Sequence, residues 1–196
     1  MTNYGIIKSK DIINRDNYSK NRKVLRTNMV ATKKNRRLDI GSNITIYFEN
    51  KKTIMHQINE MVFIENGGDT QIKEEIEAYK SLVPSGNDLV ATLMVEVDNP
   101  IKRAELLGKL GGFEEKLYLK IGDITIKGEA ELDGDRTTAD GKASSVQFVH
   151  FNFTETEKKI FKIDNSKIEI GISHEYYQHS TVMNNLTIRE LREDLS

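Results

Sequence analysis

The residues best suited to chemistry are four histidines, at positions 56, 150, 174 and 179. His56 and Glu60 are four positions apart, which places both side chains on one face of a helix, where they could hold one ion together. His174 and His179 follow a predicted strand closely, and His150 lies inside another strand. Because the sequence has no Cys, a bound transition metal would have imidazole and carboxylate ligands, which suit zinc, iron or manganese.

We therefore predict a divalent metal ion (Fe, Mn or Zn) with candidate ligands His56, Glu60, His150, His174 and His179. Spacing alone leaves an alternative without a metal. In that case His56 pairs with Glu60 on a solvated face, His150 is a hydrogen-bonded core residue, and the last two histidines have no role. An enzyme that uses a histidine as general base without a metal also stays open, because histidine titrates near neutral pH.

The second candidate group is basic. Positions 1–37 hold eleven Lys or Arg residues and two Asp residues, although the net charge of the whole chain is −1. Residues 19–37 contain neither Gly nor Pro and favour a helix, on which a turn of 100° per residue gathers five cations into one stripe: Arg15, Arg22, Arg26, Lys33 and Arg37. The planar guanidinium group binds phosphate and carboxylate well, so Arg22, Arg26 and Arg37 are candidate residues for an anion or an acidic partner. The alternative is that this helix packs on the acidic remainder of its own fold and its cations stay solvated. Because no aromatic stacking series or nucleic-acid motif accompanies the charge, nucleic acid is not an expected partner.

A third candidate is the polar stretch 128–145, which is long for a loop inside one domain and therefore a candidate functional segment. It is not a phosphate-binding P-loop, because Arg136 and Ala143 stand where that motif needs Gly and Ser or Thr. The charged residues here either pair with one another or offer a charged rim to a ligand. They are Asp135, Arg136, Asp140 and Lys142.

Hydrophobic periodicity and capping residues predict a single α+β domain with a mainly antiparallel sheet and flanking helices. Residues 1–37 would form a basic N-terminal helical segment packed on an α+β core of residues 38–196. The expected strands cover 37–40, 43–49, 88–97, 116–121, 124–127, 145–153 and, as the last strand, 167–172. The expected helices include 51–65 after Asn50, one that ends at Tyr79, 101–110 after Asn99, a short one after Thr154, and a terminal one opened by Thr187 and Glu190.

Composition limits the location of the protein. The longest uncharged apolar run, 89–95, is far shorter than the ~20 residues that span a bilayer. The first residues show no signal-peptide pattern. We therefore expect a soluble, cytoplasmic protein without a membrane partner.

Three runs carry a resemblance to a known family: 55–68 (MHQINEMVFIENGG), 135–151 (DRTTADGKASSVQFVHF) and 171–179 (GISHEYYQH). They are similar to a bacterial domain-of-unknown-function family, numbered three thousand five hundred and one, and the similarity extends nearly end to end. Genes of that family often lie beside rubrerythrin-like and iron–sulfur oxidoreductase genes. The resemblance therefore implies a role in redox metabolism or oxidative stress, and a rubrerythrin-like or iron–sulfur redox protein as partner. Family members commonly have a second His where this chain has Asn59, so no ligand role is expected there.

Two hypotheses follow for the function. The first is a redox-associated protein that holds a metal through His and Glu. The second is a metal-free adaptor that binds an anion or a protein through its N-terminal arginine surface.

Overall fold

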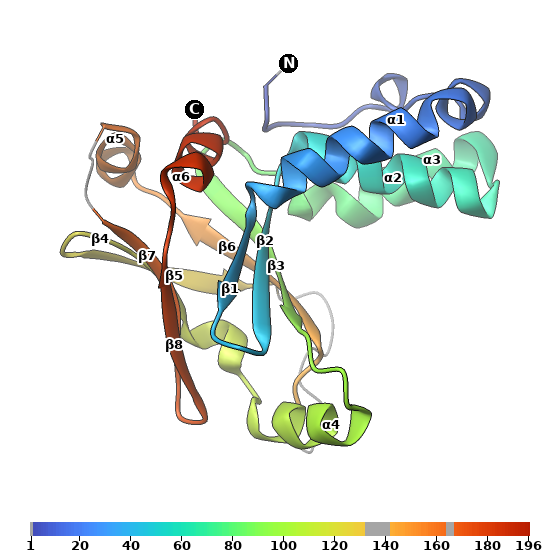
Figure 1. The fold of residues 1–196 in the computed structure, drawn as a ribbon. Helices are drawn as coiled ribbons and strands as arrows, with labels where there is room; N and C mark the ends of the chain where they lie inside the picture. The colour runs from blue at the N-terminus through green and yellow to red at the C-terminus, as the bar shows by residue number, and fades with distance from the viewer. Residues whose placement is uncertain (1, 132–141, 164–166) are drawn as a thin grey trace.

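The computed structural model describes residues 2–131, 142–163 and 167–196, and within them eight strands form one antiparallel sheet. The strand order is β1-β2-β3-β6-β5-β4-β7-β8. The sheet curls until β8 lies beside β1, so the two edge strands meet (Figure 1). The strands are β1 (Arg37–Ile40), β2 (Ile44–Glu49), β3 (Asp88–Val95), β4 (Leu117–Ile121), β5 (Ile124–Ala130), β6 (Val146–Asn152), β7 (Ile168–His174) and β8 (Tyr177–Val182).

The helices gather in separate places around this sheet (Figure 1). One group of three lies together on the side of β2 and β3: α1 (Arg15–Lys34), α2 (Lys51–Glu65) and α3 (Gly68–Tyr79). At the opposite end lies α4 (Pro100–Lys109), while α5 (Glu155–Ile163) and α6 (Asn185–Arg192) lie near the C-terminus. Three short 3-10 helices complete the described part: η1 (Ser9–Asp11), η2 (Lys80–Leu82) and η3 (Phe113–Lys116). The α+β class with an antiparallel sheet is therefore confirmed.

Successive side chains of β3 point to opposite faces of the sheet, and both faces are buried here. Leu89, Ala91 and Leu93 point into the main core inside the curled sheet. Val90 points the other way and packs in a second core with Ile54 and other residues of the helical group. Because helices cover the outer face here, the outward residues of β2, β3 and β6 lie at an interface between two layers.

Tyr177 joins the two ends of the curled sheet. Its buried hydroxyl donates to the carbonyl of Ile40 at 2.6 Å and accepts from the amide of Asn43 at 3.2 Å. Between these two partners, Gly41 adopts φ +70°, a left-handed conformation that side chains other than Gly rarely adopt. The β1–β2 turn is thereby fixed against β8.

Three of the predicted helix starts are confirmed by their caps. The Asn50 side chain accepts from the amide of Thr53 at 2.9 Å, and the Thr53 hydroxyl accepts from the amide of Asn50 at 2.9 Å. This reciprocal pair begins α2 at the predicted residue. Asn99 likewise caps α4, and Thr154 pairs with Glu157 at the start of α5.

Several predicted bounds differ by a few residues, and three differences change the description of the fold. The first helix ends at Lys34 instead of residue 37, because Arg36 is buried against Asp194 and Arg37 begins β1. Strand β7 is not the last one. Strand β8 was missed because it is an edge strand with mostly exposed polar residues, which show no burial alternation.

The third difference is the cap of α6. Asn184, not Thr187, caps this helix, and the amide of Thr187 donates to the Asn184 side chain at 2.9 Å.

Candidate functional site

The predicted pair of His56 and Glu60 lies on α2, but Glu60 is engaged by other groups. Arg22 of α1 donates from Nε to Glu60 Oε1 at 3.0 Å and from Nη2 to Oε2 at 2.8 Å. The Tyr18 hydroxyl donates to Oε1 at 2.7 Å. The Arg22 hydrogen bonds, with help from Tyr18, lower the pKa of Glu60 to about 2. Three donors from α1 thus occupy the carboxylate, whose role here is to hold α1 on α2.

His56 itself faces α1. Its Nδ1 lies 3.4 Å from the Tyr18 hydroxyl. Burial lowers the pKa of the imidazole. The neutral ring therefore packs inside the helical group, beside the Glu60–Arg22 pair.

His150 lies elsewhere, on the outward face of β6. Its Nδ1 is 3.1 Å from Asp88 Oδ2, and its Nε2 is 3.6 Å from Glu131 Oε1. The hydrogen bond with Asp88 raises the pKa of His150 and, in return, lowers the pKa of Asp88. An imidazole with a carboxylate at each nitrogen favours the protonated form, which cannot coordinate a metal.

The other two histidines belong to the β7–β8 hairpin. His174 Nε2 lies 3.3 Å from the carbonyl of Gly111, and its Nδ1 accepts from the amide of Tyr176. The ring of His179 packs on Tyr177, with 4.5 Å between centroids. The four histidines thus have separate surroundings. In residues 2–131, 142–163 and 167–196, no three His, Asp or Glu side chains are grouped so that they could hold a metal ion. The metal stays a prediction without a located site.

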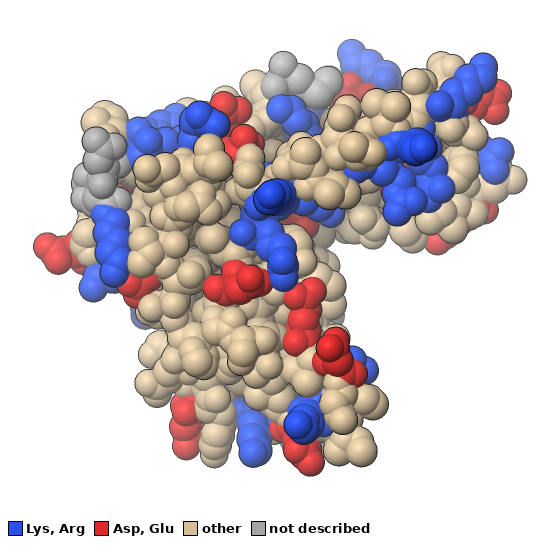
Figure 2. Space-filling view, in the orientation of Figure 1, with Lys and Arg blue, Asp and Glu red and all other residues tan. Residues whose placement is uncertain are grey.

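Four of the five cations of the predicted stripe belong to α1: Arg15, Arg22, Arg26 and Lys33. Figure 2 shows Lys and Arg side chains gathered over this helix, at the upper right of the view. An open groove of about 540 Å³ runs along it, and we call it the α1 groove. It is lined by Ser19, Arg22, Lys23, Arg26, Thr27 and Val30 of α1 and by Phe63 of α2.

The cations of the α1 groove differ in their partners. The Arg22 guanidinium, held by Glu60, stacks over the Phe63 ring at 4.8 Å, and Arg15 approaches the same ring at 5.4 Å. Lys23 and Arg26 are exposed, and within the described residues neither forms an ion pair. Two exposed valines of the same helix, Val24 and Val30, have 61% and 71% of their surface in solvent.

Arg37 does not belong to this groove. Since the helix ends at Lys34, Arg37 stands on β1, where it pairs with Asp39 at 3.0 Å and Glu96 at 3.6 Å. Its guanidinium also lies 5.7 Å from the centre of the Tyr47 ring. Its charge is therefore met by carboxylates of its own fold.

The third candidate group is only partly described. Asp135, Arg136 and Asp140 lie outside the described residues. Whether they pair with one another therefore stays a prediction. Lys142 is described and exposed, just before β6.

Sequence reasoning missed Glu49 at the end of β2. Its carboxylate is buried in a cavity between the sheet and the helical group. The capping box that begins α2 could have signalled it, because Thr53 of that box also donates to the Glu49 side chain at 2.5 Å. No pattern in the sequence, however, places Thr92 of β3 on the same carboxylate.

The described chain has no helix with both the length and the apolar character needed to cross a bilayer.

Comparisons with known proteins agree with the family resemblance. Residues 6–195 match the family model described as "Protein of unknown function (DUF3501)". A crystal structure of a "novel protein of unknown function" from Burkholderia pseudomallei K96243 is 30% identical in sequence, with a TM-score of 0.91. That match covers 98% of this chain and 100% of the other. No curated protein matches the sequence.

Proposed function

The chain belongs to the DUF3501 family of proteins of unknown function, and from that premise we propose that it is a metal-free binding module. Its α1 groove would take an acidic segment of a partner protein. The observation that carries this proposal is that Lys23 and Arg26 are exposed on the groove without an ion-pair partner among the described residues.

The groove is organised before any partner arrives. Glu60 and the Phe63 ring fix the Arg22 guanidinium from two sides, so little side-chain freedom would be lost when it meets a carboxylate. Arg22 retains 30% of its side-chain surface in solvent. One fixed and two exposed cations in a single groove would attract a negatively charged chain and steer its approach.

An exposed valine favours a protein segment over a nucleic acid. Val30 offers apolar surface beside the cations of the groove, which suits a peptide that alternates acidic and apolar side chains. The nearest aromatic ring, Phe63, already contacts the guanidinium groups of Arg22 and Arg15, and the described lining of the groove includes no second aromatic ring for a base to stack on.

The partner implied by the family resemblance, a rubrerythrin-like or iron–sulfur redox protein, is the first one to test. The competing hypothesis, a redox-associated protein with a His and Glu metal site, has no observation in its favour among the described side chains.

The experiment is a fluorescence-anisotropy titration with a labelled peptide that alternates Glu and Leu. We expect the Lys23→Glu/Arg26→Glu variant to bind at least about tenfold more weakly than the wild type. The matched control, Lys102→Glu/Lys109→Glu, makes the same charge change at two exposed positions of α4 and should bind like the wild type. Val30→Ser should also weaken binding, which charge attraction alone does not predict.

If the control variant weakened peptide binding equally, the proposal would be contradicted, because the net charge of the protein alone would then explain the loss of affinity. So would tighter binding of a single-stranded oligonucleotide than of the peptide, or binding abolished by inorganic phosphate at its ordinary cellular concentration.

A further inference from the structure

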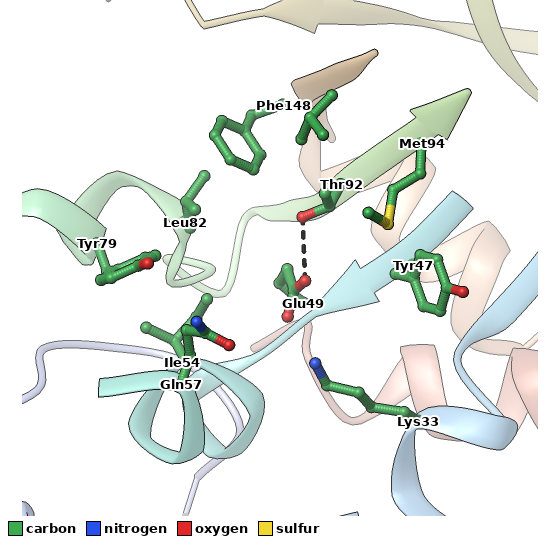
Figure 3. Close-up of a pocket in the computed structure, with 11 residues that line it drawn as sticks. Lys33, Tyr47, Glu49, Ile54, Gln57, Tyr79, Leu82, Thr92, Met94 and Phe148 are labelled. Carbon is green, nitrogen blue, oxygen red and sulfur yellow. Dashed lines mark hydrogen bonds between the residues drawn. The ribbon is translucent and has the colours of Figure 1, made fainter. Parts of the chain in front are cut away.

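A second cavity, which shares no lining residue with the α1 groove, lies between the helical group and the outer face of the sheet. It has a volume of about 330 Å³, within the range of small-molecule sites. Its walls are mainly apolar and come from separate elements, among them Tyr79, Leu82, Met94 and Phe148. Figure 3 shows these side chains around Glu49, with Lys33 of α1 at the lower right of the view. The cavity is therefore formed by the packing of the whole helical group on β2, β3 and β6.

Glu49 is held in place inside this cavity. The Thr53 hydroxyl donates to Oε2 at 2.5 Å and the Thr92 hydroxyl donates to Oε1 at 3.0 Å. Only 9% of the residue is exposed, and no cation within the described residues pairs with it. A carboxylate can accept about four hydrogen bonds, so this one keeps room for further donors. A buried charge without a counter-ion is costly unless a bound group compensates it.

Lys33 supplies the opposite charge at the same cavity. Its side chain is half-buried and lines the space, yet within the described residues it forms neither a hydrogen bond nor an ion pair. The cavity thus presents one anion and one cation that do not neutralise each other directly. A ligand that pairs with both must carry a cationic donor and an anionic acceptor on one molecule.

We propose that this cavity binds a small zwitterion with an apolar body, namely an apolar or aromatic α-amino acid. Its ammonium group would donate to Glu49, and its carboxylate would accept from Lys33. Its side chain would lie among Tyr79, Leu82 and Phe148. Aromatic walls suit such a side chain, because offset or edge-to-face ring contacts add to the burial of apolar surface. This site goes beyond the proposed partner-binding function and does not depend on it.

The test is isothermal titration calorimetry of the full chain with L-phenylalanine and L-leucine, together with two analogues that each lack one charge. Phenethylamine has no carboxylate, and 3-phenylpropionate has no amine. We expect the amino acids to bind and to raise the melting temperature of the protein, with each analogue at least about tenfold weaker, since it leaves one protein charge unpaired.

Variants assign the two charges. Glu49→Gln should remove the preference for phenylalanine over 3-phenylpropionate, and Lys33→Met should remove the preference for phenylalanine over phenethylamine. The matched controls are Glu74→Gln on α3 and Lys34→Met on α1, both exposed and outside the cavity, and both should bind like the wild type. Because Lys33 is only half-buried, Lys33→Met keeps the test valid if Glu49→Gln fails to fold.

The proposal is overturned if neither amino acid binds at about 10 mM, a concentration that would detect millimolar affinity. It is equally overturned if phenethylamine binds as tightly as phenylalanine, or if the Lys34→Met control loses as much affinity as Lys33→Met.

Discussion

Arg36 and Asp194 form a buried ion pair that joins the start of the sheet to the end of the chain. The Arg36 side chain is 1% exposed and the Asp194 side chain 0%. Arg36 also donates from Nε to the carbonyl of Phe48 at 2.9 Å and from Nη2 to the carbonyl of Glu49 at 3.1 Å. One guanidinium thus connects the end of α1, the end of β2 and the segment after α6, and it supports the backbone of the residue that carries the cavity carboxylate.

Asp194→Asn should therefore destabilise the fold strongly. It removes the negative charge and leaves Arg36 as an uncompensated buried cation, so we expect a loss of about 3–5 kcal/mol in the free energy of unfolding. Urea denaturation measures this loss. The control is Glu77→Gln, which breaks the exposed pair with Lys80 and should change stability by less than about 1 kcal/mol.

The double variant Arg36→Met/Asp194→Leu gives a further check. With both charges gone, no ion remains buried, and the double variant should be more stable than Asp194→Asn alone. A double variant as unstable as the sum of the two single changes would show that the pair does not act as a unit.

His150 and Asp88 predict a pH dependence of stability. The pKa of His150 is raised above its ordinary 6.5, chiefly by Asp88. The protonated ring therefore stabilises the folded state fully below about pH 6.5, and this stabilisation is lost as the pH rises through the raised pKa. The pKa of Asp88 is lowered from 3.8, so its contribution is present above about pH 4 and is lost as the pH falls. Glu131, the other carboxylate at the ring, acts in the same direction as Asp88.

His150→Gln should therefore cost most stability between about pH 4.5 and 6.5 and much less at pH 8.5. Thermal unfolding of both proteins across this range measures the difference. His179→Gln is the comparison, because the His179 ring packs on Tyr177 and has no carboxylate partner within the described residues. The same pH profile in both variants would contradict the role assigned to Asp88.

Local patterns in the sequence predicted most of the helices and strands. They could not predict which distant segments contact one another. The predicted cap, Asn50, placed the start of α2 correctly because a cap and the first residues of its helix belong to one turn. The position of Glu60 was also predicted, but not its partners, since Arg22 is 38 positions away and meets it only when α1 packs on α2. The same reason explains why Glu49 went unnoticed: one of its two threonines is 43 positions away, on β3.

Metal content tests the two functional hypotheses against each other. We expect untagged protein purified without chelator to hold far less than one Fe, Mn or Zn per chain by plasma mass spectrometry. His174→Ala should then leave the melting temperature nearly unchanged, because the hydrogen bonds of this side chain within the described residues are one of 3.3 Å with the Gly111 carbonyl and one with its own turn. Near-stoichiometric metal that is lost in His174→Ala would restore the metal hypothesis and overturn the metal-free module.

Replacement by Ala should have opposite effects on stability at Gly41 and at Gly108. At Gly41, φ is +70° and an added Cβ would lie 2.6 Å from the Tyr177 hydroxyl oxygen, so Gly41→Ala should cost about 1–3 kcal/mol. At Gly108, inside α4, an added Cβ meets nothing within 4 Å, and Gly108→Ala should stabilise the protein by about 0.5–1 kcal/mol. Urea denaturation of both variants measures these changes.

The clash at Gly41 also predicts coupling with Tyr177. Tyr177→Phe removes the nearest atom and the hydroxyl hydrogen bonds to Ile40 and Asn43 together. Gly41→Ala in that background should therefore cost less than it does in the wild type, because part of its cost is the displacement of this hydroxyl. Strict additivity would mean that the Tyr177 hydroxyl adds nothing to the cost, which would then come from the left-handed backbone and from the His179 ring, 2.7 Å from the added Cβ.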